Sequence, residues 1–205
     1  MRTSDLKLKR LAAGSPDRSR AAAANVVARA ERLGLVDVAV GTVDAPIGRL
    51  TLAVTPRGLA RVAFEDEDPE LLLDELARDL SPRVLESLRA TQDWRREIEE
   101  YFDGRRRKFD LPVDRRLVRG IARDVLAATA HVPFGGTTTY GEIAERIGRP
   151  RAARAVGNAL GSNPIPIVIP CHRVLRAGGS LGGYGGGVDR KRMLLSLEGA
   201  VPDTV

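Results

Sequence analysis

Between residues 36 and 64, hydrophobic positions alternate with other residues, and this period of two predicts β-strands. Val36, Val38 and Val40 begin the pattern, and residues 50–54 and 59–64 continue it after two turns. The turns are marked by proline and glycine at residues 44–48 and 56–58. We therefore expect a small antiparallel sheet.

Elsewhere the apolar residues recur at helical spacing. The pattern predicts helices near residues 21–33, 69–80, 87–102, 116–130 and 190–198, the last with Asp189 as its cap and Gly199 as its stop. The basic run 105–108 and the following residues 109–112 are typical of a connector. We accordingly predict an Ala/Arg-rich extension over residues 1–35, a sheet domain over 36–112 and a second domain over 113–205.

The second domain contains a candidate helix-turn-helix. Thr139 and Glu142 have the spacing of a capping box, so a helix should begin there and end near Gly148. Pro150 is expected at the start of the next helix, residues 151–160, since the first turn needs no amide hydrogen from it. Two short helices joined by a tight turn are typical of this motif.

Composition places the chain among ordinary globular proteins, with 205 residues, 43% hydrophobic and 29% charged. No apolar run reaches the roughly 20 residues of a membrane-spanning helix, and no secretory signal is recognisable. The single cysteine, Cys171, cannot form an internal disulfide, and with two histidines it makes a poor zinc site. We expect a cytoplasmic protein without a metal or other cofactor.

Charge is distributed unevenly. Residues 1–112 hold 20 basic and 20 acidic residues, whereas residues 113–205 hold 13 basic and 7 acidic ones, so the whole net charge of +6 lies in the second part. This distribution indicates a polyanionic partner such as nucleic acid, although a solvated basic surface is an equally simple explanation.

Cys171 stands in the segment Ile169-Pro170-Cys171-His172-Arg173-Val174. A lone cysteine is usually a small buried hydrophobe. Here, however, two basic residues follow it, which would favour a thiolate, and the prolines 166 and 170 stiffen its approach. If the segment is extended, Cys171 and His172 point to opposite faces, so a water between them is expected instead of a direct hydrogen bond.

Glu198 lies in the last turn of the final predicted helix, where a carboxylate opposes the helix dipole. It is either a solvent-exposed glutamate that tolerates this position or a carboxylate that orients His172, as in other nucleophile–base–orienter sets.

Two further features have a structural and a functional interpretation. Seven glycines between residues 178 and 187 surround Tyr184, and the loop is either a flexible surface segment or one that lets a flat ligand approach the backbone. It lacks the residues of a phosphate-binding loop. In the helix 151–160, Arg151 and Arg154 are either plain surface charges or DNA contacts.

Six motifs within about 70 residues together resemble the O6-alkylguanine-DNA alkyltransferases, or methylated-DNA–protein-cysteine methyltransferases. They are Val132-Pro133-Phe134-Gly135, Thr139-Tyr140-Gly141-Glu142-Ile143-Ala144, Arg154-Ala155-Val156-Gly157, Asn163-Pro164 with the cysteine segment, Gly183-Tyr184-Gly185-Gly186 and Leu194-Leu195-x-x-Glu198-Gly199. The resemblance implies an α+β chain with a ribonuclease-H-like sheet domain and a winged-helix-like second domain.

The resemblance also implies roles for individual residues. Cys171 would accept the alkyl group, and His172 would deprotonate the Cys171 thiol through a water. Glu198 would orient the histidine. Tyr140 would help to flip the nucleotide and would protonate the departing guanine. Arg154 would fill the vacated stack from the minor groove, and Asn163 would brace the cysteine segment. The remaining residues expected at the DNA or the substrate are Arg151, Val174, Tyr184, Gly185 and Gly186.

The implied function is single-turnover repair of O6-alkylguanine in double-stranded DNA by a monomer, with O4-alkylthymine as a further candidate substrate. Departures from the family pattern occur at Leu126, Thr138 and Gly185, and the last bears on the substrate range. The alternatives are a lesion sensor without transfer activity, a regulator triggered by alkylation and a cysteine hydrolase. The presence of Cys171 argues against the sensor.

Overall fold

The computed structural model describes residues 25, 27, 29–30 and 32–200. Its first half is a four-stranded sheet in the order β3-β2-β1-β4, formed by β1 (Val38–Val43), β2 (Leu50–Thr55), β3 (Gly58–Phe64) and β4 (Val84–Glu86). The three predicted strands are confirmed and are antiparallel. The sheet also contains a strand that the sequence pattern does not indicate, the short β4, which pairs in parallel with β1.

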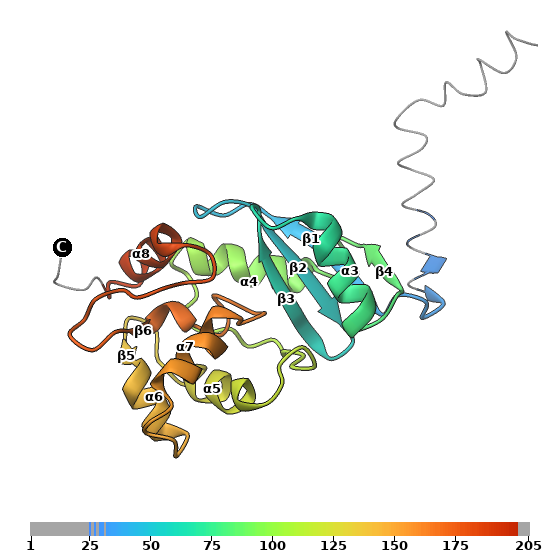
Figure 1. The fold of residues 1–205 in the computed structure, drawn as a ribbon. Coiled ribbons are helices and arrows are strands. Elements are labelled where there is room, and N and C mark those ends of the chain that lie inside the picture. Colours follow the sequence, from blue (N-terminus) through green and yellow to red (C-terminus); the bar gives the residue numbers. More distant parts are fainter. Residues whose placement is uncertain (1–24, 26, 28, 31, 201–205) are drawn as a thin grey trace, which may run out of the picture.

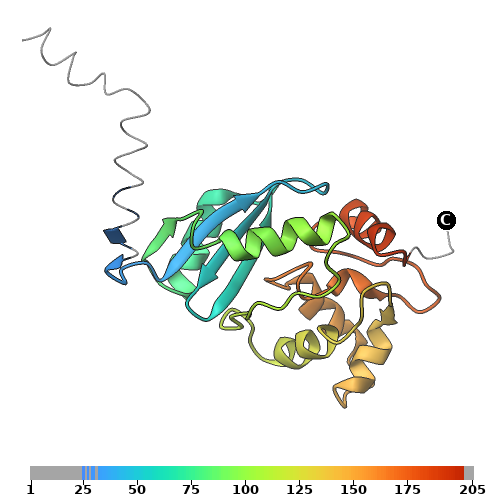
Figure 2. The same ribbon diagram turned by 180° about the vertical axis from the view of Figure 1, so that it is seen from behind.

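Two helices cover opposite faces of this sheet, α3 (Pro69–Asp79) and α4 (Gln92–Phe102) (Figures 1 and 2). Helix α3 begins where predicted, with the Asp68 side chain accepting hydrogen bonds from two amides of its first turn. Helix α4 begins five residues later than predicted. The Ser87 hydroxyl accepts a hydrogen bond from the Ala90 amide, and this local side-chain bond stabilises a turn in place of a first helical turn.

The second half begins with α5 (Ile121–Thr129). The expectation of a helix from residue 116 is wrong, because Gly120 adopts φ = 57° and ψ = −142°, a conformation that no helix contains. The chain continues through β5 (Thr138–Thr139), α6 (Tyr140–Arg146), α7 (Ala153–Gly161), the 3₁₀ turn η1 (Cys171–Arg173), β6 (Val174–Leu175) and α8 (Val188–Leu197). Strands β5 and β6 pair in parallel.

Helices α6 and α7 form the predicted helix-turn-helix, and the capping box of Thr139 and Glu142 is present. Helix α7 starts at Ala153 instead of residue 151, since residues 149–152 form a turn closed by the hydrogen bond from the Ala152 amide to the Arg149 carbonyl. Pro150 lies in that turn. Asp189 is not the cap of α8; Gly187 is, and Asp189 lies inside the first turn.

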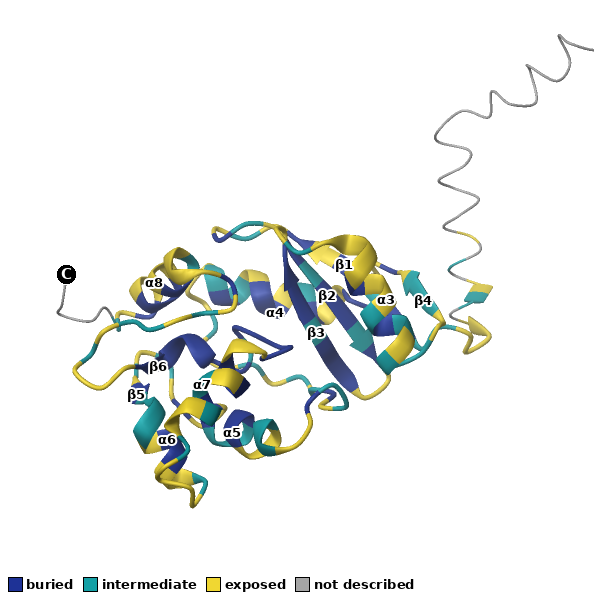
Figure 3. Cartoon of the chain, viewed as in Figure 1, coloured by how far each residue is buried: buried dark blue, intermediate teal, exposed yellow. Residues whose placement is uncertain are grey.

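One hydrophobic core extends from the α4 face of the sheet into the helical half, and a smaller cluster lies between the sheet and α3 (Figure 3). The Val62 amide of β3 donates a hydrogen bond of 2.8 Å to the Pro164 carbonyl. The segment that leads to Cys171 is thus packed directly against the edge of the sheet.

The expected helix over residues 21–33 lies only partly within the described residues, of which 25, 27, 29–30 and 32 are helical. Within the described part, no helix is long and apolar enough to cross a membrane.

Candidate active site

Cys171 is the first residue of η1 and is almost completely buried. Its Sγ accepts a hydrogen bond of 3.2 Å from Nδ2 of Asn163, which also donates to the Ile169 carbonyl at 2.9 Å. Oδ1 of Asn163 accepts from the Ile165 amide. Cys171 and His172 do not lie on an extended segment, the condition under which they would point to opposite faces, because they form a 3₁₀ turn preceded by turns that include Ile167 at φ = 74°.

His172 and Glu198 are in direct contact. Glu198 caps the C-terminal end of α8, and its Oε1 lies 3.0 Å from Nε2 of His172. Both side chains are fully buried. The alternative of a solvent-exposed glutamate is therefore wrong, and the penalty of the helix dipole is offset by the groups around the carboxylate.

Those groups include two further donors. Arg173 binds Glu198 through Nε and Nη2, each at 2.8 Å, and Nη1 donates to the Val132 carbonyl. The hydroxyl of Tyr101, on α4, donates to Oε1 at 2.6 Å. Arg173 is thus engaged by the carboxylate, and the expectation that it stabilises a thiolate at Cys171 is wrong.

The pKa values follow from this arrangement. Burial raises the pKa of Glu198, but the hydrogen bonds from His172 and Arg173 outweigh burial and bring it to about 2. Burial lowers the pKa of His172 against the opposing effect of Glu198, so the imidazole is neutral near pH 7. Because the ionised carboxylate can only accept, Nε2 of the neutral ring carries the hydrogen, and Nδ1 is left as an acceptor.

Burial raises the pKa of the Cys171 thiol to about 11, although the hydrogen bond from Asn163 and the charge of Lys191 act in the opposite direction. Lys191 is itself fully buried, and its Nζ donates to the carbonyls of Val174, Leu181 and Gly183. Burial lowers the Lys191 pKa to about 8. This ammonium therefore anchors the glycine-rich loop and is the cation that acts on the sulfur.

Sequence reasoning missed Lys191 and Tyr101. For Lys191 a signal existed, because Lys191, Leu194 and Glu198 lie three and four residues apart and so share one face of α8. Tyr101 carried no such signal, since it comes from the other half of the chain, 97 residues from Glu198.

A hollow of about 590 Å³ opens between Cys171 and the helix-turn-helix. It is lined by Tyr140, Arg154, Cys171, Tyr184 and Gly185, five of the predicted site residues. Burial raises the pKa of Tyr140, so its hydroxyl keeps its proton near pH 7. Arg154 is exposed at the rim.

The other predicted residues lie elsewhere. Asn163 and Gly186 line a second cavity on the sheet side of Cys171, described below. Arg151 is exposed and lines neither of these two spaces. Val174 is fully buried in β6 and also lines neither of them, so its contribution is to the packing beneath the site. In the described part of the chain, no group of three or more His, Cys, Asp or Glu side chains could hold a metal ion.

Comparison with known proteins agrees with this architecture. Residues 38–115 match the ribonuclease-like domain of 6-O-methylguanine DNA methyltransferase, and residues 120–200 match its DNA-binding domain. Methylated-DNA–protein-cysteine methyltransferase of Mycolicibacterium paratuberculosis is 45% identical over 159 residues, which cover 77% of this chain and 90% of the relative. The inducible enzyme of that name from Bacillus subtilis is 39% identical over 72% of this chain and 82% of its own length.

Solved structures show the same relationship. The crystal structure of Mycobacterium tuberculosis OGT in complex with DNA has a TM-score of 0.68 and 39% identity, and it covers 81% of this chain and 96% of that chain. The predicted fold class, a sheet domain followed by a helical DNA-binding domain, is confirmed. The chain belongs to the methylated-DNA–protein-cysteine methyltransferase family.

Proposed function

We propose that this protein repairs DNA by moving the alkyl group from O6 of an alkylated guanine to the sulfur of Cys171. The observation that carries the proposal is the placement of Cys171. Its thiol lines a hollow next to the helix-turn-helix, in a segment braced by Asn163, and the adjacent His172 is paired with the buried Glu198. A nucleophile, a base and an orienting carboxylate are the groups that this displacement requires.

His172 supplies the base in this proposal. Its Nδ1 is buried and has no hydrogen-bond partner among the described residues. An unpaired buried acceptor costs about 1–3 kcal/mol. An ordered water that donates to Nδ1 and accepts from the Cys171 thiol would remove this cost and carry the proton.

Proton removal has to accompany the attack. With a pKa of about 11, the Cys171 thiol is almost entirely protonated at pH 7. Because the thiolate is the nucleophile, His172 has to remove the proton of the Cys171 thiol, and the charge of Lys191 stabilises the thiolate that forms. The S–C bond forms as the C–O6 bond breaks, the electron pair passes to the guanine, and Tyr140 donates a proton toward it.

The DNA would bind through α6 and α7. Reaching O6 requires extrusion of the nucleotide, which costs a few kcal/mol. Arg154, exposed at the rim of the hollow, would insert from the minor groove and fill the gap left by the extruded nucleotide, a device known among proteins that bind there. Arg149 and Arg151 are exposed in the turn before α7, where they would contact phosphates.

The stoichiometry follows from the sequence. The thioether product is stable, and the chain has no second cysteine to take over the alkyl group. Each molecule would repair one lesion and be spent. We further propose that it acts as a monomer in the cytoplasm and that residues 36–112 and 113–205 form its two domains, with residues 1–35 as an extension.

The proposal is tested with Cys171→Ala and a duplex that carries one O6-methylguanine with a radiolabelled methyl group. The variant should transfer no label while binding the duplex with an affinity close to that of the unsubstituted protein. Label that still arrives on the Cys171→Ala protein would contradict the assignment of the acceptor.

A further inference from the structure

A groove of about 600 Å³ lies beside the segment that leads to Cys171. Its walls are the connector that runs from α4 to α5 (Figure 2), residues 130–134 after α5 and residues 167–170 before η1. We call this space the basic groove. None of the described residues that line it belongs to α6 or α7 or lines the hollow beside α7. The basic groove therefore lies outside the surface proposed to bind DNA.

Much of the lining of the basic groove is aliphatic. Leu111 and Val113 come from the connector, and Ile167, Val168 and Ile169 come from the cysteine segment. Leu111, Val113 and Val168 are partly exposed to solvent. Concave apolar surface of this size is typical of binding sites, because an apolar side chain that enters it is removed from water.

The charge at the groove is positive and unbalanced. Arg107, Lys108 and Arg115 line it, are exposed and have no ion-pair partner among the described residues. Arg173 also lines it, but its guanidinium is bound by Glu198. None of the described residues that line the groove is acidic. Three cations are thus available to a negatively charged partner.

The other basic residues of the connector differ in this respect. Arg105 binds Asp103, Arg106 binds Glu97, Glu100 and Asp110, and Arg116 binds Asp114. These paired arginines do not line the groove. The connector therefore neutralises its cations within the chain everywhere except at the groove.

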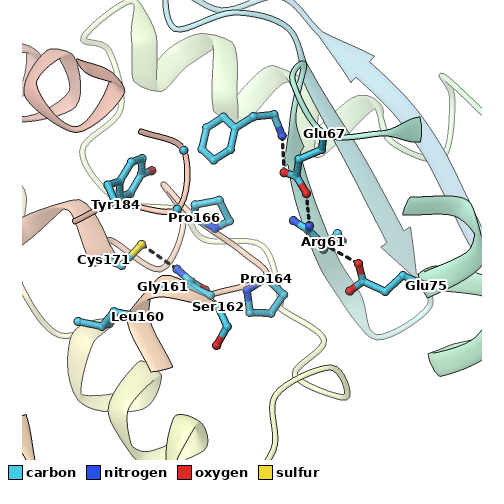
Figure 4. A pocket seen from close by; sticks show the side chains of 14 residues that line it. Arg61, Glu67, Glu75, Leu160, Gly161, Ser162, Pro164, Pro166, Cys171 and Tyr184 are labelled. Atoms are coloured by element: carbon cyan, nitrogen blue, oxygen red, sulfur yellow. Dashed lines mark hydrogen bonds and ion pairs between the residues drawn. The ribbon is translucent and has the colours of Figure 1, made fainter. Parts of the chain in front are cut away.

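The cavity on the sheet side of Cys171, of about 380 Å³, has a different charge pattern. Figure 4 shows Cys171 at one end of it and Arg61 with Glu67 and Glu75 at the other. Phe64 also lines it. Arg61 forms ion pairs with both carboxylates, so its charge is balanced inside the protein. An unbalanced set of cations is a feature of the basic groove and not of every hollow in this chain.

Nucleic acid would also neutralise these cations, but single strands bind by stacking their bases on aromatic rings. The two rings that line the groove are already engaged. Arg107 lies over Phe134, 5.6 Å from the ring centroid, and Phe109 packs against Trp94 and Tyr101. The apolar surface that remains is aliphatic, and it fits an apolar side chain of a peptide better than a nucleobase.

From these observations we infer that the basic groove binds an acidic peptide segment of a partner protein. One large apolar side chain of the segment packs against the aliphatic lining, and its carboxylates pair with Arg107, Lys108 and Arg115. The connector is held in place for this, since the Leu59 amide donates to the carbonyl of residue 112 and the Leu59 carbonyl accepts from the amide of residue 114. A groove formed in advance lowers the entropic cost of binding.

The test measures fluorescence anisotropy with the fluorescein-labelled peptide Asp-Glu-Asp-Phe-Asp-Glu. We expect saturable binding that weakens as the salt concentration rises. Replacing the phenylalanine of the peptide by serine should weaken binding at least about tenfold, because the burial of a large apolar side chain is lost. Replacing its carboxylates by amides should abolish binding. No saturable binding of the original peptide, or equal binding of the serine peptide, would overturn the inference.

The protein variant Arg107→Glu with Arg115→Glu replaces attraction by repulsion and should weaken peptide binding at least about tenfold. The matched control is Arg89→Glu with Arg192→Glu, which makes the same change of charge at exposed positions outside the groove. It should bind the peptide within about twofold of the unsubstituted protein. Thermal unfolding checks that both variants are folded. Equal affinities of the two variants would overturn the inference.

Two other occupants are distinguished by the same variants. If the groove variant, unlike the control, loses affinity for single-stranded oligothymidylate while it still binds the peptide, the groove is a nucleic-acid site and the inference is wrong. Self-association of the unsubstituted protein that the groove variant loses, measured by analytical ultracentrifugation, would assign the groove to a second copy and also overturn it. None of these measurements depends on alkyl transfer, so the proposed function is tested separately.

Discussion

The hydroxyl of Tyr101 donates a hydrogen bond of 2.6 Å to Oε1 of Glu198, so a residue of the sheet domain holds the carboxylate that orients His172. Both side chains are buried. Burial and the neighbouring carboxylate raise the pKa of Tyr101, which keeps its hydroxyl a donor at every physiological pH. The first half of the chain is thus part of the active-site support and not only a scaffold beside it.

Removal of the Tyr101 hydroxyl should destabilise the protein. A buried hydrogen bond to a charged group contributes about 1.5–3 kcal/mol. We expect Tyr101→Phe to lower the free energy of unfolding by about that amount and to slow alkyl transfer, as measured by urea denaturation and single-turnover kinetics. Tyr184→Phe is the control, because the buried Tyr184 hydroxyl has no hydrogen-bond partner among the described residues. Equal losses of stability in the two variants would contradict this account.

Glu198 should make stability depend on acid pH. Its pKa is about 2 in the folded protein and 4.5 without the fold, so its contribution is complete above pH 4.5 and is lost as the pH falls through 2. The difference in unfolding free energy between the unsubstituted protein and Glu198→Gln should shrink by about 3 kcal/mol from pH 5 to pH 2. Denaturant titrations at several pH values measure it. A difference independent of pH would show that Glu198 is not held as an ionised acceptor.

Arg154 should contribute more to the rate of alkyl transfer from duplex DNA than to the rate of transfer from a free base. The side chain lies at the rim of the hollow that contains Cys171, where it can replace an extruded nucleotide. We expect Arg154→Ala to slow transfer from an O6-alkylguanine duplex at least tenfold more than transfer from the free O6-alkylguanine base. Arg151→Ala, which removes an exposed arginine two residues before α7, should affect duplex binding without this difference. Equal slowing of both reactions by Arg154→Ala would refute the proposed role.

Local sequence patterns predicted the local structure well. The capping box at Thr139 depends on residues three positions apart, and the strands from residue 38 to 64 depend on a hydrophobic period of two. Both signals are local and can therefore be recognised in the sequence. Element starts were less accurate. The backbone conformation of Gly120 and the side-chain hydrogen bond of Ser87 make α5 and α4 begin later than hydrophobic spacing alone predicts.

The site was predictable where its residues are close in sequence or carry a family motif. The contacts of Asn163 with the cysteine segment and of Glu198 with His172 were expected and are present. Tyr101 and Phe64 were not foreseen, because they reach the site only through the packing of the sheet against the helical half. Such contacts between distant segments depend on three-dimensional packing and leave no periodic signal in the sequence.

The most direct test of the central claim is the intact mass of the protein after incubation with duplex DNA that contains O6-methylguanine. The account predicts a gain of one methylene mass, since a methyl group replaces the thiol hydrogen. The added mass should lie on the peptide containing Cys171, with one lesion repaired per protein molecule. Repair without a mass change, or a methyl group on any other residue, would contradict it.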